Sequence, residues 1–267
     1  MTTPEDASGM PPTDLPRSVA LLWGLDREGE RGPRRGLTLE QILDTAIALA
    51  DAEGSSALSM NRIGKELGVT AMSLYRYVEN KQTLVMLVLD RVIGSPPEIA
   101  ADDGWRAGLR AWALAEFETV ARHPWWLDMP LAGPPMGPNN MAWLEAGLAT
   151  LGRTNLPESM RLQLVMNLSL YVLGRFWAAK DFIADQGGDH DFEGAMRSVL
   201  DPARFPALLS ALAQRAFDGD IDWARADFEF GLDRMLDGYE RFLDSGGFDA
   251  GQSDVVDGGA AGGRAAS

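Results

Sequence analysis

The feature that most limits the fold of this 267-residue chain is the stretch SMNRIGKELGVTAMSLYRYV, which spans Ser59 to Val78. Its apolar residues recur at helical spacing on both sides of a glycine, without the alternation of a half-buried strand. Ser59 and Thr70 are good N-caps for two short helices. Gly68 can end the first helix in the left-handed conformation that glycine adopts without penalty. The stretch therefore predicts helix, tight turn, helix.

The same helical period continues through the rest of the chain. A helix is expected to begin near Leu37 and to end at Gly54, and Asn80 can cap a longer helix after the stretch. Further helices are predicted at residues 102–122, 138–152, 157–185, 203–217 and 222–245. The expected fold class is therefore all-α.

Charge separates one small zone from an acidic chain. The formal net charge is -15, and residues 92–267 hold fourteen Lys/Arg against 26 Asp/Glu. By contrast, residues 59–81 hold four basic residues against two acidic ones. Only that N-terminal zone would tolerate a polyanion. The chain has no cysteine, no secretory signal pattern and no apolar run of membrane length, so we expect a cytoplasmic protein without a membrane partner.

The second helix of the stretch would show a mixed face to solvent if Leu74 and Val78 point inward. That face would consist of Ala71, Met72, Ser73, Tyr75, Arg76 and Tyr77. Such a set can read base edges and hold phosphates, as the second helix of a helix-turn-helix does. The alternative is an ordinary helical hairpin inside an all-α core.

The longer segment ALSMNRIGKELGVTAMSLYRYVENKQTLV resembles the N-terminal DNA-binding region of the tetracycline-repressor (TetR) family. The shared positions are Leu58, Ile63, Leu67-Gly68-Val69, Ser73-Leu74-Tyr75, Val78, Asn80-Lys81 and Leu84. The resemblance implies a homodimer on a palindromic double-stranded DNA operator. It also implies an all-helical C-terminal domain that binds a small-molecule effector and then releases the DNA.

The resemblance also implies roles for single residues. Tyr75, Tyr77 and Lys81 would contact the DNA backbone, with help from Ser59 and Arg62. The residues nearest the base edges would be Ala71, Met72, Ser73 and Arg76. The family varies at these last four positions, so the operator sequence does not follow.

These observations predict an N-terminal three-helix helix-turn-helix DNA-binding domain plus a larger helical ligand-binding and dimerisation domain. The expected boundaries are a disordered extension at 1–30, a basic arm at 31–36, the DNA-binding domain at 37–92, the helical domain at 93–245 and a disordered tail at 246–267. The arm carries Arg31, Arg34 and Arg35, which could enter the minor groove beside the operator. The alternative is a solvated linker.

Seven of the eight tryptophans lie in the larger domain, and HPWWLDMPLAGPPMGPNNMAW is rich in methionine and proline. Adaptable methionines and large aromatic rings suit a pocket for a bulky, partly aromatic ligand. The candidate ligand residues are Trp112, His123, Trp125, Trp126, Met129, Asn140, Trp143, Met166, Tyr171 and Trp177. The alternative is that these residues fill the core.

The segment 157–185 is apolar on more than one side, which requires two burial partners. One partner could be a second subunit, since two helices from each chain commonly form the dimer interface in the TetR family. The alternative is a wholly internal helix.

The sequence gives little support for an enzymatic function. The acidic loop around His190 could bind a metal, but a solvated loop is the simpler interpretation, and no catalytic fingerprint, metal site or cofactor site is expected. The magnesium-tetracycline ligand set of some TetR members has no match here. The sequence thus predicts a ligand-responsive transcriptional regulator, most simply a repressor. The alternative is an enzyme or sequestering carrier that acts on a hydrophobic compound.

Overall fold

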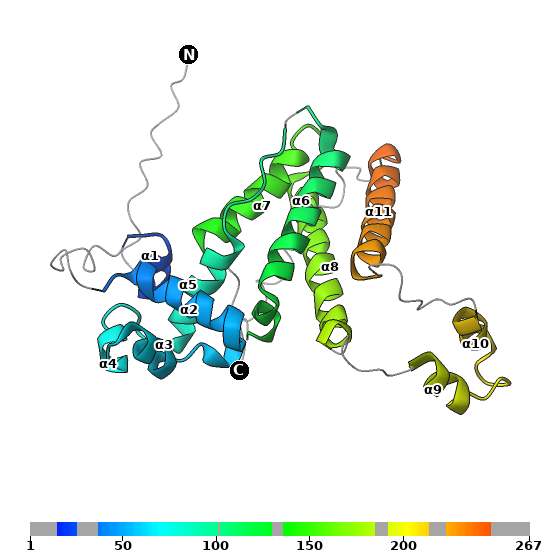
Figure 1. Ribbon diagram of the computed structural model, residues 1–267. Coiled ribbons are helices and arrows are strands. Elements are labelled where there is room, and N and C mark those ends of the chain that lie inside the picture. The colour runs from blue at the N-terminus through cyan, green and yellow to red at the C-terminus, as the bar shows by residue number, and fades with distance from the viewer. Residues whose placement is uncertain are drawn as a thin grey trace, which may run out of the picture. The chain divides into compact units, whose positions relative to one another are not determined.

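The computed structural model describes residues 15–25, 37–100, 102–129, 136–184, 192–213 and 223–246 (Figure 1). Every regular element in these ranges is a helix, which confirms the all-α prediction. The chain forms two compact units. Unit 1 comprises residues 1–98, 114–146 and 176–180, and unit 2 comprises residues 99–113, 147–175 and 181–267. Among the described helices, none is long and apolar enough to cross a membrane.

The N-terminal part of unit 1 contains α1 (Arg17–Leu22), α2 (Leu39–Glu53), the 3-10 helix η2 (Ser55–Ala57), α3 (Met60–Leu67), α4 (Ala71–Leu74) and α5 (Lys81–Ile93). Side-chain caps explain where three of them begin. Thr38 and Gln41 form a reciprocal capping box at α2, and Asn80 Oδ1 accepts from the Thr83 N–H at α5. Ser59 Oγ accepts from the Arg62 N–H at α3, as predicted.

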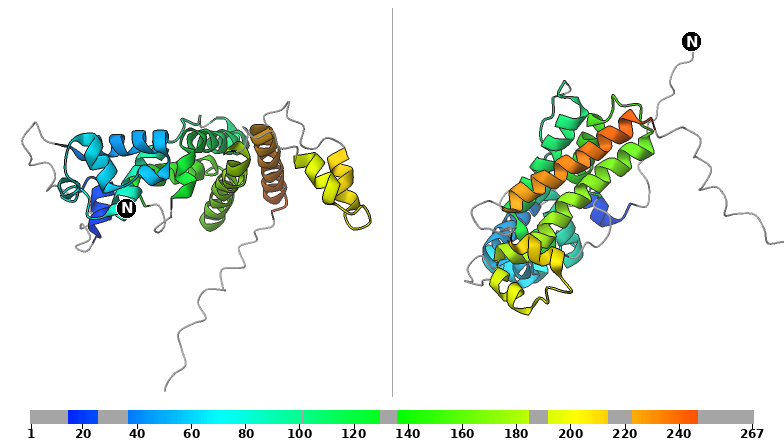
Figure 2. Two further views of the ribbon diagram at one scale, coloured as in Figure 1. Left: turned by 60° about the horizontal axis from the view of Figure 1, so that its bottom comes forward. Right: turned by 90° about the vertical axis from the view of Figure 1, so that its right-hand side faces the viewer.

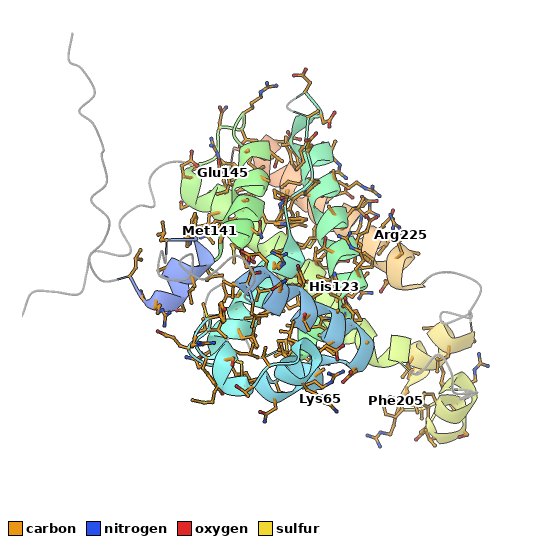
Figure 3. All side chains as sticks on the ribbon, turned by 60° about the vertical axis from the view of Figure 1, so that its left-hand side comes forward. Lys65, His123, Met141, Glu145, Phe205 and Arg225 are labelled. Carbon is orange, nitrogen blue, oxygen red and sulfur yellow. The ribbon has the colours of Figure 1, made fainter. Side chains whose placement is uncertain are left out.

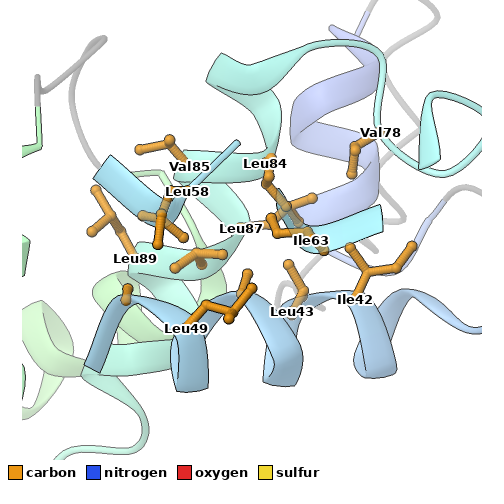
Figure 4. Packing of buried hydrophobic residues seen from close by; sticks show 14 of the residues in the cluster. Ile42, Leu43, Leu49, Leu58, Ile63, Val78, Leu84, Val85, Leu87 and Leu89 are labelled. Atoms are coloured by element: carbon orange, nitrogen blue, oxygen red, sulfur yellow. The ribbon is translucent and has the colours of Figure 1, made fainter. Parts of the chain in front are cut away.

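A single apolar cluster holds α2 to α5 together (Figure 4). Its fully buried members come from every helix of the group: Ile42, Ala46, Leu58, Ile63, Leu74, Val78, Leu84 and Val88. Each buried Leu, Ile or Val contributes about 1.5–3 kcal/mol through removal of apolar surface from water. The periodic residues of the sequence are therefore the ones that build this core.

Helix α1 lies inside the extension that was expected to be disordered, so that expectation was wrong for residues 17–22. Leu21 and Leu22 pack against the apolar cluster, and α1 contacts α5. Without these tertiary contacts, six residues would be too few to form a stable helix in water.

The longer helices are α6 (Gly104–Arg122), α7 (Pro138–Thr150), α8 (Glu158–Ala184) and α11 (Trp223–Asp244), with a 3-10 helix η3 (Pro124–Asp128) after α6. Their bounds agree with the predicted segments to within two residues. Helix α10 (Pro206–Ala213) begins three residues later than predicted, and the rest of that prediction, residues 214–217, lies outside the described residues. Helix α9 (Phe192–Val199) was not predicted.

Within unit 2, α8 and α11 run side by side (Figure 2). The Tyr171 ring stacks on the Phe228 ring at 5.5 Å between centroids, and the Tyr171 hydroxyl donates to the Phe228 carbonyl. Nearby, Gly231 lets the helices approach closely, because a Cβ there would collide with the Tyr171 hydroxyl. Farther along, Tyr239 donates to the Leu164 carbonyl at 3.0 Å, and burial raises the pKa of Tyr239 to about 12.

Ion pairs join the first half of α6 to α11 in the same unit. Arg106 bonds Asp237 and Glu240, while Arg110 bonds Glu229 and Asp233. Hydrogen bonds from Arg106, and then from Arg234, lower the pKa of Asp237. Exposed pairs of this kind add little stability singly, but they fix which face of α11 meets α6.

Candidate DNA-binding surface and effector domain

The turn between α3 and α4 is tight because two glycines allow it: Gly68 adopts a left-handed conformation, and Gly64 permits close backbone packing. Gly68 adopts φ 68° and ψ 26°, the predicted left-handed C-cap of α3. At Gly64, a Cβ would lie 2.9 Å from the Val69 carbonyl oxygen, so only glycine lets α3 and the turn pack this closely. The Val69 N–H donates back to the Gly64 carbonyl at 2.8 Å. The turn thereby sets the angle at which α4 leaves α3.

Helix α4 is shorter than the predicted helix over residues 70–78. Regular α-helix ends at Leu74, and the chain continues as a turn whose Tyr77 and Val78 N–H groups both donate to the Leu74 carbonyl. The Thr70 side chain does not cap α4 as expected, and its Oγ1 lies 3.0 Å from Ser73 Oγ instead. Ser73 is thus partly occupied by a neighbouring hydroxyl.

Four of the predicted DNA-contacting residues are exposed to solvent. Met72 is 75 % exposed and Tyr75 is 42 % exposed, and both Arg76 and Lys81 are exposed. Leu74 and Val78 are fully buried, which fixes the helix so that these four side chains face solvent. The structure therefore exposes apolar, aromatic and cationic groups at the helix-turn-helix and at the start of α5.

Two residues of the predicted set face inward. Ala71 and Tyr77 pack against the apolar cluster, and the Tyr77 hydroxyl donates to the Leu37 carbonyl at 2.6 Å. Tyr77 therefore anchors the start of α2, and the expectation that it covers the outward side was wrong. The reason is that the turn after Leu74 rotates Tyr77 toward α2.

Arg62 and Ser59, the two predicted helpers from α3, already have partners within the protein. The Arg62 guanidinium bonds Glu53 at 2.5 Å and Glu66 at 2.8 Å. The hydrogen bond from Arg62 lowers the pKa of Glu53, and the two carboxylates raise the pKa of Arg62. DNA would have to compete with these carboxylates for Arg62.

On the same helix, Lys65 projects into solvent (Figure 3). The arm residues Arg31, Arg34 and Arg35 lie outside the described residues.

The segment after α6 belongs to the core of the DNA-binding helices. Trp125 in η3 is 5 % exposed and is a member of the apolar cluster formed by α2 to α5. Its indole N–H donates to Asp51 Oδ1 at 2.6 Å, and His123 Nδ1 lies 2.7 Å from the same oxygen. Trp126 and Met129 pack against the same cluster. The sequence predicted that these four residues line an effector pocket, but Trp125, Trp126 and Met129 pack in a different core and His123 lies beside Asp51.

This placement predicts a large loss of stability in a Trp125→Ala variant. Removal of a buried tryptophan leaves a cavity and costs about 3–5 kcal/mol. Thermal unfolding followed by circular dichroism would measure the change, with Trp23→Ala as a control because Trp23 is 46 % exposed. An unchanged unfolding temperature in Trp125→Ala would contradict the assignment.

Asn140 and Trp143 are also occupied by contacts within unit 1. Asp90, 5 % exposed on α5, accepts from the Asn140 backbone N–H at 3.0 Å and from Asn140 Nδ2 at 2.8 Å. The Asn139 N–H also points to this carboxylate at 3.3 Å. Asp90 thus satisfies the open N–H groups at the start of α7. The Trp143 indole N–H donates to the Gly94 carbonyl at 2.9 Å.

The remaining candidates separate into inward and outward positions. Trp112 is buried in unit 2, where a Cβ at Gly147 would lie 3.4 Å from its indole ring. Tyr171 connects α8 to α11, as described above. By contrast, Met166 is 44 % exposed and Trp177 is 67 % exposed on α8, which does not match the expectation of an enclosed pocket.

Sequence reasoning missed two carboxylates that organise unit 1, Asp51 and Asp90. Asp90 carried a signal, since it is the one acidic residue in the apolar run TLVMLVLDRVI. A carboxylate in such a run requires hydrogen-bond donors. For Asp51, at the polar end of α2, the sequence offers no comparable sign.

Comparison with known proteins was made against family models, curated sequences and solved structures. Residues 42–87 match the model described as bacterial regulatory proteins, tetR family, and residues 96–243 match the tetracyclin repressor-like C-terminal domain. The transcriptional repressor DrrR1 of Streptomyces coeruleorubidus is 36 % identical to this chain over 240 residues. The match covers 85 % of this chain and 86 % of the DrrR1 sequence.

The chain belongs to the TetR family. Among solved structures, the Streptomyces coelicolor TetR-family protein ActR in complex with (S)-DNPA is 26 % identical, with a TM-score of 0.64, covering 79 % of this chain and 98 % of ActR. ActR in complex with actinorhodin aligns with a TM-score of 0.67 at 24 % identity, covering 80 % of this chain and 100 % of ActR.

The family assignment decides between the two functions predicted from sequence. This TetR-family protein is a DNA-binding transcriptional regulator with a C-terminal effector domain and not an enzyme, and several of its curated relatives are repressors. The acidic loop around His190 lies outside the described residues, and the described part of the chain contains no group of three or more potential metal ligands.

Proposed function

We propose that this TetR-family protein is a repressor that binds a palindromic operator as a homodimer and is released by a bulky hydrophobic or aromatic ligand. The observation that carries the proposal is the exposed set Met72, Tyr75, Arg76 and Lys81, held outward by buried Leu74 and Val78. In this proposal Tyr75 and Lys81 hold the DNA backbone, while Met72 and Arg76 reach base edges.

Support for a dimer comes from one uncovered face of α8. Leu162, Met166, Leu170 and Trp177 follow one another at helical spacing and are 41 %, 44 %, 61 % and 67 % exposed. Contiguous apolar surface of this kind marks an interaction site. On α11 in unit 2, Phe230 is 63 % exposed. A second copy that covered both helices would form a four-helix interface.

Two helical glycines support the same interface. Gly174 on α8 and Gly238 on α11 have open space where a Cβ would stand, so packing within the protomer does not require glycine at either position. Glycine inside a helix costs about 1 kcal/mol relative to alanine. Close approach of a partner helix would account for that cost. Because Met166 and Trp177 are exposed on this face of α8, we assign them to the dimer interface and not to the ligand pocket.

The ligand class is inferred from similarity and from residue types. ActR, 26 % identical to this chain, was solved with (S)-DNPA bound. The C-terminal domain here buries Trp112, Phe117, Trp143 and Phe176. Large aromatic surfaces favour a bulky, largely apolar effector.

The regulatory mechanism would rest on the distance between two recognition helices. Specific binding requires them about one turn of DNA apart, roughly 34–36 Å. An effector that prefers a different separation weakens DNA binding, typically by about 1–3 kcal/mol of coupling. The effector domain therefore regulates DNA binding without touching DNA.

Selection of bound fragments from a random DNA library tests the proposal. We expect a palindromic motif, and we expect a matching ligand to release that DNA and to quench tryptophan fluorescence. Trp112→Phe should reduce the quenching, whereas Trp23→Phe, at the exposed C-cap of α1, should not. Recovery of no sequence motif, or of a motif without twofold symmetry, would overturn the homodimeric operator model.

The basic segment before α2 leads to a separate prediction. Simultaneous change of Arg31, Arg34 and Arg35 to alanine should weaken operator binding by about tenfold, and the slope of log affinity against log salt should shrink by up to about three per subunit. Light scattering should show an unchanged dimer. Point substitutions are preferred to truncation, because removal of residues 1–35 would also remove α1. Equal affinity and equal salt slope would show that the segment is only a linker.

A further inference from the structure

Helix α1 lies N-terminal to the part of the chain that matches the family's DNA-binding model, which begins at residue 42. It is nevertheless built into unit 1. Leu21 and Leu22 pack against the apolar cluster, and α1 contacts α5. At its far end, the Trp23 indole N–H donates to the Met136 carbonyl at 2.9 Å. These contacts place the N-terminal end of α1 at a defined position.

That position is next to the proposed DNA-binding surface. Arg17 Nη1 lies 3.5 Å from Glu79 Oε1, and the two side chains are 40 % and 43 % exposed. Glu79 directly follows buried Val78 and stands two residues before Lys81. A phosphate held by Tyr75 and Lys81 would therefore pass close to the Glu79 carboxylate.

Part of the positive charge near this surface is already paired. Arg62 is held by Glu53 and Glu66, whereas Arg76 and Lys81 are exposed and are the proposed DNA contacts. The chain as a whole carries a formal net charge of -15. A carboxylate beside the phosphates would repel DNA unless a cation balances it, since charges a few ångströms apart interact appreciably even near water. Among the ion pairs of the described residues, the one to Glu79 comes from Arg17.

We propose that α1 is a fourth helix of the DNA-binding domain and that Arg17 neutralises Glu79 where the DNA backbone passes. The proposal rests on the proposed function, because it takes Tyr75 and Lys81 as phosphate contacts. Arg17 acts through Glu79 and has no role in reading bases. Its effect should therefore be equal on all DNA sequences.

The rival explanation is that the ion pair merely fastens α1 to the segment just before α5. The two explanations differ in what Glu79 does. If Arg17 balances repulsion, Glu79→Gln removes the repulsion and should restore binding to an Arg17→Ala protein. If the pair is only a fastening, Glu79→Gln breaks it just as Arg17→Ala does, and both single variants should bind alike.

The experiment uses the full chain and a random-sequence 40-base-pair duplex at low salt, with affinity measured by fluorescence anisotropy. We expect Arg17→Ala to weaken binding by about three- to tenfold and to lower the salt slope by up to about one per subunit. Glu79→Gln should bind at least as tightly as the wild type, and the double variant should be close to the wild type. Arg17→Lys should retain most of the affinity.

Arg91→Ala is the matched control. It removes an exposed ion pair on the same helix, ten residues after Lys81, or about 15 Å farther along. It should leave DNA affinity unchanged. All variants should keep their unfolding temperature within about 2 °C, because exposed ion pairs add little stability.

The outcomes distinguish failure of the proposed DNA-binding function from failure of the role proposed for Arg17. Absence of duplex binding by the wild type would overturn the proposed function. Normal wild-type binding with an unaffected Arg17→Ala variant would overturn the role of Arg17 alone. Weak binding by both Arg17→Ala and Glu79→Gln, together with weak binding by the double variant, would show that the pair only fastens α1.

Discussion

A Leu170→Glu variant is expected to be a folded monomer that no longer binds operator DNA. Leu170 is 61 % exposed in the middle of the apolar face of α8, so the substitution costs the protomer little. In the proposed interface, however, it would bury an unpaired carboxylate, which is strongly unfavourable. The dimer should dissociate. Each monomer would then hold a single half-site, and loss of bivalent binding should reduce operator affinity by about a hundredfold or more.

Light scattering and fluorescence anisotropy would measure the two effects. Leu25→Glu is the matched control, because Leu25 is 59 % exposed but lies three residues after the end of α1, far along the chain from α8. It should remain a dimer. A dimeric Leu170→Glu protein at micromolar concentration would show that this face of α8 is not the interface.

Leu236 gives a useful contrast. From sequence it is a candidate for the dimer interface, since it falls on the apolar stripe of α11. The structure shows it fully buried within its own protomer, so a charge there should unfold unit 2 rather than yield folded monomers. Helical circular dichroism should be lost in Leu236→Glu and retained in Leu170→Glu.

The second large effect is expected on the recognition surface. Lys81→Ala and Tyr75→Ala should weaken binding to operator and random DNA by the same factor, because phosphate contacts position the protein without reading sequence. Arg76→Ala should instead relax the preference at one base position per half-site by about 1–3 kcal/mol if its guanidinium reads a guanine. Affinity measured over a set of single-base operator variants would separate the two behaviours.

Tyr77→Phe is the control for this series. The Tyr77 hydroxyl bonds the Leu37 carbonyl, so its removal should cost about 0.5–1.5 kcal/mol of stability and leave sequence preference intact. A change of preferred bases in Tyr77→Phe, or an unchanged preference in Arg76→Ala, would require the assignments of the two residues to be revised.

The DNA-binding motif was predictable because local chemistry determines it. Ser59 and Asn80 cap their helices through bonds to residues three positions away, and Gly68 takes the left-handed conformation that the turn demands. The periodic Ile63, Leu74 and Val78 are all fully buried. Each of these features depends on residues within one or two helical turns, so sequence spacing is sufficient to recognise it.

Other parts of the site depended on contacts between distant residues. Tyr77 faces inward because its hydroxyl donates to the carbonyl of Leu37, forty residues earlier. Arg62 is held partly by Glu53 at the end of α2. Helical periodicity identifies which residues are apolar, but it does not say which distant group each side chain meets.

The tryptophan-rich segment after α6 shows the same division most clearly. By itself, the sequence determined an all-α chain, the helix-turn-helix and the long helices that follow it, since caps, glycines and apolar spacing act locally. Only the tertiary structure decided that Trp125 completes the core of the DNA-binding helices, that Asp51 receives its indole N–H, and that α1 docks on α5. The physical reason is that burial of an aromatic ring is equally favourable in any core that fits it, so the choice among cores is made by long-range packing.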